Sequence, residues 1–311
     1  MILTVTLNPS VDRRYTLNKF EKGNIYRTNN YQYTAGGKGL NVTKVINSLS
    51  ADVLTTGFLG GSIGDYIKKD LVKKGIDNDF VSIEEETRSC LAIISDAGCQ
   101  TEILESGPLI SKVEIENFYK KYNELLDTVD IVCASGSLPV GMDIDTYKNL
   151  INLAKRKGKK FLLDTSGDAL KFGIEACPYL IKPNKEELEQ LTGISILNQD
   201  KLIEAVKYLL NKHIEVVVIS LGEEGALAFH HDNAYKINIP KVKVESPVGS
   251  GDSMIAGFAV GLQRRYDFKD ILRLGAACGT ANAMESETGK VDINNVNSIL
   301  EKITIEEFKM P

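Results

Sequence analysis

The stretch SPVGSGDSMIAGF, residues 246–258, sets three nearly bare backbone positions, 249–251, in front of Asp252 and an apolar segment. The apolar residues 254–262 predict a buried helix that begins close to Asp252. A carboxylate at a helix start commonly accepts hydrogen bonds from backbone N–H groups, so capping is one interpretation. The other is chemical, because free N–H groups at the positive end of a helix bind phosphate and a neighbouring carboxylate accepts protons.

Before and after this stretch, short β-rich runs and segments of helical period alternate along the chain. This alternation predicts an α/β fold with a doubly wound, mostly parallel sheet and helices on both faces. Several runs are apolar throughout, as parallel strands buried on both faces are. The predicted strands are residues 2–7, 53–60, 131–136, 160–164, 180–183 and 216–222, and the predicted helices are 39–49, 63–75, 111–127, 143–157, 185–192, 199–213, 252–264, 268–284 and 292–302.

Two stretches interrupt this alternation. Residues 11–35 and 87–106 alternate polar and apolar positions around turns at Glu21-Lys22-Gly23 and Asp96-Ala97-Gly98, which predicts antiparallel strands. We expect a small β-sheet that projects from the main domain as a lid or as a dimer surface. No linker is long enough to separate independent domains, so residues 1–311 are expected to form one domain with this lid.

The composition excludes several classes of protein. Of 311 residues, 43% are hydrophobic and 25% are charged, with a net charge of −5, which is ordinary for a soluble globular protein. No Lys/Arg run is long enough to follow a nucleic-acid backbone, so no nucleic-acid partner is expected. The start, MILTVTLNPSVD, is no signal peptide, and the longest apolar run is far short of a membrane span. We therefore expect a cytoplasmic protein without a membrane partner.

Cysteine and histidine give no sign of a metal centre or a disulfide framework. The five cysteines are scattered and include no C-x-x-C pair, so buried free thiols in a reducing compartment are expected. The pair His230-His231 stands before Asp232-Asn233 and is expected in an exposed turn rather than on a metal.

Small and polar residues follow many of the predicted strands, and ligands of open α/β sheets bind beyond those carboxyl ends. The nucleotide fingerprints G-x-x-x-x-G-K-[ST] and G-x-G-x-x-G are both missing, which disfavours a P-loop NTPase and a standard dinucleotide enzyme. Lys38, flanked by glycines, either supplies a positive charge to a ligand or is a solvated lysine in a turn. The groups at the strand ends are Asn8, Asp12, AGGKGLN (35–41), Ser135-Gly136-Ser137, Lys182-Pro183-Asn184 and Ser220-Leu221-Gly222.

Four of these motifs together resemble the ribokinase-like, PfkB-type carbohydrate kinases. They are AGGKGLN at 35–41, KPNKEE at 182–187, SLGEEG at 220–225 and the stretch 246–258, in the order typical of that family. The resemblance implies a ribokinase-like sheet with a β-lid, ATP as phosphoryl donor, Mg²⁺, and dimerisation through the lid.

Further motifs are similar to the phosphosugar branch of that family: TLNPSVD (6–12), Thr87-Arg88, TEILESGP (101–108) and SGSLP (135–139). They resemble tagatose-6-phosphate kinases most, with 1-phosphofructokinases close behind. The implied reaction converts D-tagatose 6-phosphate to the 1,6-bisphosphate, and fructose 1-phosphate is the alternative substrate. A kinase for an unphosphorylated sugar or nucleoside would leave Lys38 and Arg88 without an anion, and a non-catalytic sugar-phosphate sensor would need a missing catalytic group.

The resemblance also assigns roles to residues. Asp252 would be the catalytic base, with the N–H groups of Gly249, Ser250 and Gly251 as the anion hole. Sugar hydroxyls would contact Asp12, Gly37 and Asn41. The phosphate already on the substrate would be held by Lys38 and Arg88, with Arg27 as a further lid candidate.

On the nucleotide side, Asn184 and Glu187 would organise Mg²⁺ through water, and Lys182 would lie near the ATP phosphates. A purely structural alternative for Glu187 is a first-turn glutamate that complements the helix dipole. Pro247 stands where the family frequently has threonine, so no hydroxyl is available there. The nucleotide path would be lined by Ser220, Gly222 and Gly225, with Asn282 either near the purine or an ordinary polar helix residue.

Overall fold

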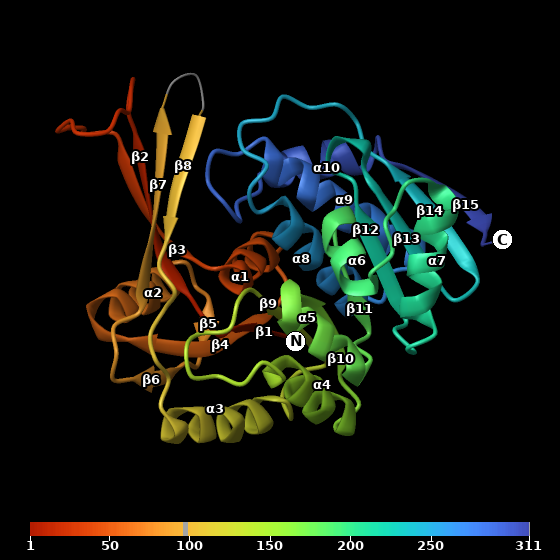
Figure 1. Ribbon diagram of the computed structural model, residues 1–311, viewed down its shortest axis with the longest axis horizontal. Coiled ribbons are helices and arrows are strands. Elements are labelled where there is room, and N and C mark those ends of the chain that lie inside the picture. The colour runs from red at the N-terminus through yellow and green to blue at the C-terminus, as the bar shows by residue number, and fades with distance from the viewer. Residues whose placement is uncertain (96–98, 311) are drawn as a thin grey trace.

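A mostly parallel sheet of eleven strands runs through the computed structural model, which describes residues 1–95 and 99–310 (Figure 1). In the strand order given below, neighbouring strands from β5 to β12 are parallel. β13, β14 and β15 each pair antiparallel with the strand before them. β6 (Val81–Ile83) pairs with β4 off this path. The order is β5 (Asp77–Asn78), β4 (Val53–Gly60), β1 (Ile2–Thr6), β9 (Ile131–Ser135), β10 (Lys160–Asp164), β11 (Leu180–Ile181), β12 (Val216–Ser220), β13 (Ala226–His230), β14 (Asn233–Asn238) and β15 (Thr304–Lys309).

The central strands are apolar at every position because both faces of the sheet are covered. In β9, Val132 and Ala134 belong to one buried cluster, while Ile131 and Cys133 belong to the cluster on the other face. The same alternation continues in β10 and β12, as the period of two in a strand requires. The prediction of a doubly wound sheet is confirmed.

The helices form one layer on each face. The first layer is α3 (Lys112–Leu125), α4 (Thr146–Arg156), α5 (Gly167–Gly173), α6 (Lys185–Thr192) and α7 (Gln199–Leu210). The second layer is α1 (Lys38–Ser48), α8 (Ser250–Gln263), α9 (Phe268–Ala283) and α10 (Ile293–Leu300). Short 3₁₀ turns follow α5 (Ile174–Ala176) and β12 (Gly222–Glu224). Within the described residues, no helix is both long and apolar enough to cross a bilayer.

A separate four-stranded sheet stands beside this body, at the upper left of Figure 1. It is called the small sheet below, and its order is β3 (Tyr31–Gly36), β2 (Ser10–Thr16), β7 (Arg88–Ser95) and β8 (Cys99–Leu104). The β2–β3 and β7–β8 pairs are antiparallel, whereas β2 and β7 run parallel. α2 (Gly61–Lys73) packs beneath it through Ile67 and Leu71.

The small sheet was predicted from both of its segments, including the turn at Lys22-Gly23; the turn predicted at 96–98 lies outside the described residues. Its register sends alternate residues to opposite faces. Asp12, Cys90 and Leu104 share one face, and Arg13, Tyr33 and Ile103 share the other.

Several elements were not predicted, and one expectation about cysteines is wrong. β13, β14 and α5 were not predicted, and β15 follows the last predicted helix, residues 292–302. β15 has mostly exposed residues, so it lacks the apolar pattern that marks a strand. All five cysteines are free, but only Cys90, Cys133 and Cys278 are buried, while Cys99 is exposed.

Candidate active site

The helix that begins in the stretch 246–258 has no side-chain cap. α8 starts at Ser250, and its N-cap residue is Gly249, with φ of 86°. Asp252 lies in the first turn, three residues after the N-cap position, and makes no capping hydrogen bond. The capping interpretation of Asp252 is therefore wrong.

The backbone N–H groups at this helix start are largely free. Among the predicted anion-hole residues, Ser250 already donates its N–H to the carbonyl of Pro247 at 3.3 Å. In the described part of the chain, the N–H groups of Gly249, Gly251 and Asp252 have no acceptor. Three uncapped donors at the positive end of a 14-residue helix make a site for an anion.

Glycine at position 249 is required by its surroundings as well as by its positive φ. A Cβ there would lie 2.6 Å from Thr288 Cγ2 and 3.2 Å from Asn282 Oδ1. Asn282 itself is fully buried. It donates to the Val248 carbonyl at 2.9 Å and accepts from the N–H of Gly289 at 2.9 Å. The side chain of Asn282 therefore has a structural role, because it fixes the turn that leads into α8, and Asn282 is not among the residues that line the cavity.

Asp252 is buried, and its carboxylate is held in place by one hydrogen bond. Asn41 donates its Nδ2 to Asp252 Oδ2 at 2.8 Å. Burial raises the pKa of Asp252 to about 6, and the negative charge of Asp164 adds to the shift. Lys38, Asn41 and Lys182 oppose it. A carboxylate whose pKa is near 6 is ionised at neutral pH and is a better proton acceptor than an ordinary aspartate.

Asp164 is the main site residue that the sequence analysis missed. It ends β10, is buried, and lies 3.4 Å from Lys182 Nζ. Its charge is the largest cause of the raised pKa of Lys38, followed in the same direction by Asp252 and Glu187. An acidic residue directly after the apolar run Phe161–Leu163 was the available signal, since polar groups at strand ends face the ligand site.

Lys182 lies directly over the start of α8. A Cβ on Gly251 would be only 2.9 Å from Lys182 Nζ, so glycine leaves the space that the ammonium group uses. Lys182 is itself buried. The free N–H groups, Lys182 and Lys38 thus surround Asp252 and Asp164 with positive charge.

A second group of predicted residues lies where the small sheet meets the main sheet. Asp12, on β2, accepts a hydrogen bond from Ser10 Oγ at 2.7 Å, and burial raises its pKa. Gly36 must be glycine because a Cβ would lie 2.1 Å from Asp12 Oδ2. Gly37 is the N-cap residue of α1, with φ of 102°.

Arg88 begins β7 and is already partly engaged. Its Nε and Nη2 donate to the Asn8 carbonyl at 3.2 and 3.0 Å, and its Nη1 donates to the Glu105 carbonyl at 2.8 Å. Three of its five N–H groups are used in this way, which leaves two for a ligand. The guanidinium group is therefore held in a fixed orientation at the cavity wall.

The structure does not bring Arg27 to the cavity; it is exposed in the segment between β2 and β3. Arg14, which was not selected from the sequence, lines the cavity instead. Arg14 donates to the carbonyl of Ser286, and Gln32 donates to Glu287 at 3.3 Å. These contacts join the small sheet to the segment that follows α9.

On the side of β11 and β12, Asn184 and Glu187 form a capping box at the start of α6. Asn184 Oδ1 accepts from the Glu187 N–H at 2.8 Å, and Glu187 Oε2 accepts from the Asn184 N–H at 2.9 Å. Ser220 lines the same cavity, whereas Gly222 and Gly225 form the turn behind it. At Gly225 a Cβ would meet the Ile237 carbonyl oxygen at 2.1 Å.

The residues near Asn184 fit a magnesium ion that is bound largely through water. Glu187 Oε1 is not used by the capping box, and Asp164 supplies a second carboxylate on the same cavity. Mg²⁺ binds through one or two carboxylates and keeps several waters, so this donor set is suitable.

One cavity of about 570 Å³ joins these groups. It extends from Asp12 and Arg88 on the small sheet, past Asp252, to Asn184 and Ser220. In the described residues, Asn41 Oδ1 and Ser135 Oγ on its wall are buried without a hydrogen-bond partner. A cavity with an anion site, a carboxylate base and unpaired polar atoms is suited to phosphoryl transfer onto a polyhydroxy substrate.

Comparison with known proteins supports this chemistry. Residues 5–294 match the family described as pfkB family carbohydrate kinase. The chain is 42% identical to a tagatose-6-phosphate kinase from Staphylococcus epidermidis, over 99% of this chain and 100% of that one.

Solved structures with the same fold include Escherichia coli phosphofructokinase-2 in complex with substrates and products. It has a TM-score of 0.90 and 27% identity, covering 97% of this chain and 98% of that chain. A Thermotoga maritima protein described as "Possible 1-phosphofructokinase" has a TM-score of 0.89 and 26% identity over 99% of both chains.

The raised pKa of Asp252 predicts that Asp252→Asn stabilises the protein without ligand. The folded protein binds this proton more tightly than the unfolded chain, so the wild type loses stability as pH rises from about 4 to about 6. Near pH 8 the free energy of unfolding of the variant should exceed that of the wild type by on the order of 2 kcal/mol. Near pH 4 the two free energies of unfolding should converge. Urea denaturation across this range measures the difference.

The control is Asp65→Asn, an exposed isosteric change in α2. It should leave the free energy of unfolding within about 0.5 kcal/mol at all these pH values. A less stable Asp252→Asn protein at pH 8 would contradict the burial argument.

Proposed function

Since the chain belongs to the pfkB family of carbohydrate kinases, we propose that it transfers the γ-phosphoryl group of ATP to O1 of D-tagatose 6-phosphate. The products are D-tagatose 1,6-bisphosphate and ADP. The observation that carries this proposal is the buried Asp252 carboxylate beside the free N–H groups of Gly249, Gly251 and Asp252, in the same cavity as Arg88. The tagatose-6-phosphate kinase relative supports the choice of sugar.

The proposed step needs one proton acceptor and one anion site. The substrate O1 attacks the γ-phosphorus, an O–P bond forms, and the bond between the γ-phosphorus and the bridging oxygen of ADP breaks. The O1 proton passes to Asp252, which Asn41 orients. The N–H groups of Gly249 and Gly251, together with Lys182, stabilise the charge on the transferred group. Mg²⁺, held through Glu187 and Asp164, would neutralise charge on the ATP phosphates.

The two cations assigned to the substrate phosphate have different surroundings. Lys38 interacts most strongly with Asp164, then with Asp252 and Glu187, which all belong to the transfer end of the cavity. Arg88 interacts instead with Asp12. We therefore assign Lys38 chiefly to the transferred phosphoryl group and Arg88 to the phosphate already on the sugar, where its two remaining N–H groups can bind two oxygens.

The exposed face of the small sheet supports dimerisation. The residues that point away from the cavity, Tyr31, Tyr33 and Ile103, are 55%, 41% and 57% exposed. Exposed apolar residues on one face of a sheet favour an interface, and a second copy of the same sheet is a suitable cover.

A substrate panel tests the proposed sugar. In a coupled assay of ADP release, kcat/KM should be highest for D-tagatose 6-phosphate, ahead of fructose 1-phosphate and fructose 6-phosphate, and lowest for free tagatose. The alternative is a 1-phosphofructokinase, which the Thermotoga neighbour favours. A strong preference for fructose 1-phosphate would establish that alternative and reject the tagatose assignment.

Two substitutions test the roles of single residues. Arg88→Ala should raise KM for the phosphosugar more than about 10-fold and KM for ATP less than about 2-fold, because the lost contact is to the sugar phosphate. An equal effect of Arg88→Ala on both KM values would argue for an unphosphorylated substrate.

Asp252→Asn should keep ATP binding and lose on the order of 10³-fold in kcat, because the proton acceptor is lost. Retained turnover in this variant would show that Asp252 is not the catalytic base.

The dimer is tested by light scattering after gel filtration. The wild type should have the mass of a dimer at micromolar concentration, and Ile103→Asp should be a monomer because a charge in an apolar interface is costly. Glu102→Gln, one position earlier on the opposite face, is the control and should remain dimeric. A monomeric wild type would contradict the proposal.

A further inference from the structure

Three side chains with metal-binding chemistry meet at the other end of the main sheet. Glu215, His230 and His231 have ligand atoms that all lie within 4.8 Å of one another. Within residues 1–95 and 99–310, no other group of three His, Cys, Asp or Glu residues meets this criterion. Glu215 directly precedes β12, whose far end carries Ser220 of the active site, so about 16 Å of extended strand separates the two sites.

The hairpin between β12 and β13 explains why these residues are close. Val216 pairs with His230, so Glu215 and His231 occupy the next position beyond the last pair of the ladder. His231 and Asp232 form a two-residue loop into β14, because His230 pairs with Asn233. The exposed turn predicted for these histidines is confirmed for His231, whereas His230 ends β13 and is half-buried. The sequence could not show where their rings point.

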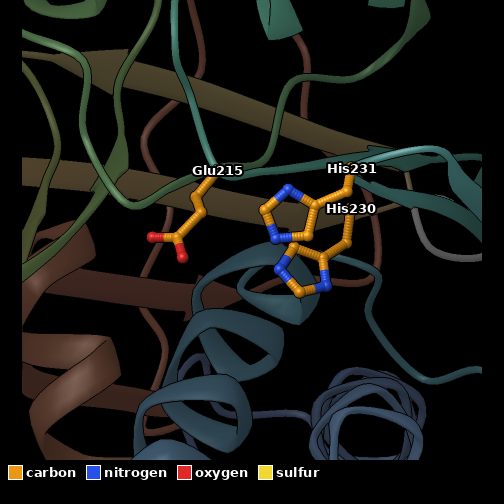
Figure 2. A group of neighbouring side chains, drawn as sticks. All are labelled: Glu215, His230 and His231. Atoms are coloured by element: carbon orange, nitrogen blue, oxygen red, sulfur yellow. The ribbon is translucent and has the colours of Figure 1, made fainter.

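The conformation of His231 brings both imidazole rings to one side. In a regular strand, adjacent residues point to opposite faces. His231 has φ of 53°, a left-handed value that favours glycine in this kind of turn, and its ring lies beside that of His230 with centroids 4.1 Å apart. Figure 2 shows that each ring turns a nitrogen toward the Glu215 carboxylate.

The three side chains have no other polar partners in the described part of the chain. Neither imidazole nor the Glu215 carboxylate makes a hydrogen bond or an ion pair there. Lys160, the cation that affects His230, lies over the ring of Tyr179, 3.9 Å from its centroid. The half-buried His230 ring is supported from behind by Phe268, at 4.6 Å between centroids.

We propose that Glu215, His230 and His231 form a binding site for a divalent transition metal of the zinc type. Two imidazole nitrogens and one carboxylate oxygen are a common zinc ligand set, and imidazole selects Zn²⁺, Ni²⁺ or Cu²⁺ over Mg²⁺. Zinc bonds of about 2.0–2.2 Å place neighbouring ligand atoms about 3.4 Å apart, so the side chains need to close by about 1 Å. Glu215 and His231 are exposed, which leaves a coordination position open to water.

Binding of Zn²⁺ by these residues is measured by competition with a chromophoric chelator. The experiment uses the full chain in a Cys99→Ser background, because Cys99 is exposed and a cysteine thiolate is itself a zinc ligand. One Zn²⁺ per chain is expected, with at least a 10-fold loss of affinity in His231→Gly and in Glu215→Gln. His213→Gln is the matched control, since His213 is the one histidine outside the cluster, and it should bind as the background protein does.

His231→Gly also separates a ligand role from a structural role. Glycine adopts the positive φ of this turn more easily, so the metal-free variant should melt at the same temperature as its parent or higher. Saturating Zn²⁺ should raise the melting temperature of the parent by several degrees and leave that of the variant unchanged. Equal zinc affinity in His231→Gly and its parent, or an equal loss in His213→Gln, would overturn the proposal, as would disappearance of all zinc binding in the Cys99→Ser background.

Discussion

Two buried carboxylates of like charge, Asp164 and Asp252, are the constraint on which the active site depends. Water is largely excluded from both, so their repulsion has to be balanced by nearby positive charge. Lys38, Lys182 and the uncapped start of α8 supply that charge. A transferred phosphoryl group carries negative charge into the same place. The two lysines and the free N–H groups, which offset the charge of the carboxylates, would also stabilise that group. The two buried carboxylates therefore lower the free energy of unfolding at the place where the chemistry occurs.

The rest of the fold holds these charges in position. The parallel strands of the main sheet end on one edge, and this edge carries Asp164 on β10 and Lys182 just after β11. α1 and α8 pack against each other, so Asn41 reaches Asp252. Lys44, buried on α1, donates to the carbonyls of Ala35 and Thr288 and so joins the small sheet to the segment beside Gly249. The wall of the cavity therefore comes from segments far apart in the sequence.

The sequence was sufficient for the fold class because buried parallel strands and amphipathic helices have clear patterns. It was also sufficient for the position of Asp252 beside bare backbone. It did not distinguish a base from a cap, because that depends on whether the helix begins at residue 250 or 253. It left two roles open for Asn282, since a buried asparagine that fixes a turn and one that binds a purine look alike in a sequence. Asp164 was missed because its importance comes from Lys38, Lys182 and Asp252, which are distant along the chain.

The central claim is that the start of α8 receives the transferred phosphoryl group while Asp252 accepts the proton. A crystal structure with a non-hydrolysable ATP analogue, Mg²⁺ and D-tagatose 6-phosphate tests it most directly. The account predicts that oxygens of the terminal phosphate lie about 3 Å from the N–H groups of Gly249 and Gly251, with the sugar O1 next to the Asp252 carboxylate. A terminal phosphate bound away from residues 249–252, or a sugar whose free hydroxyl points away from Asp252, would contradict it.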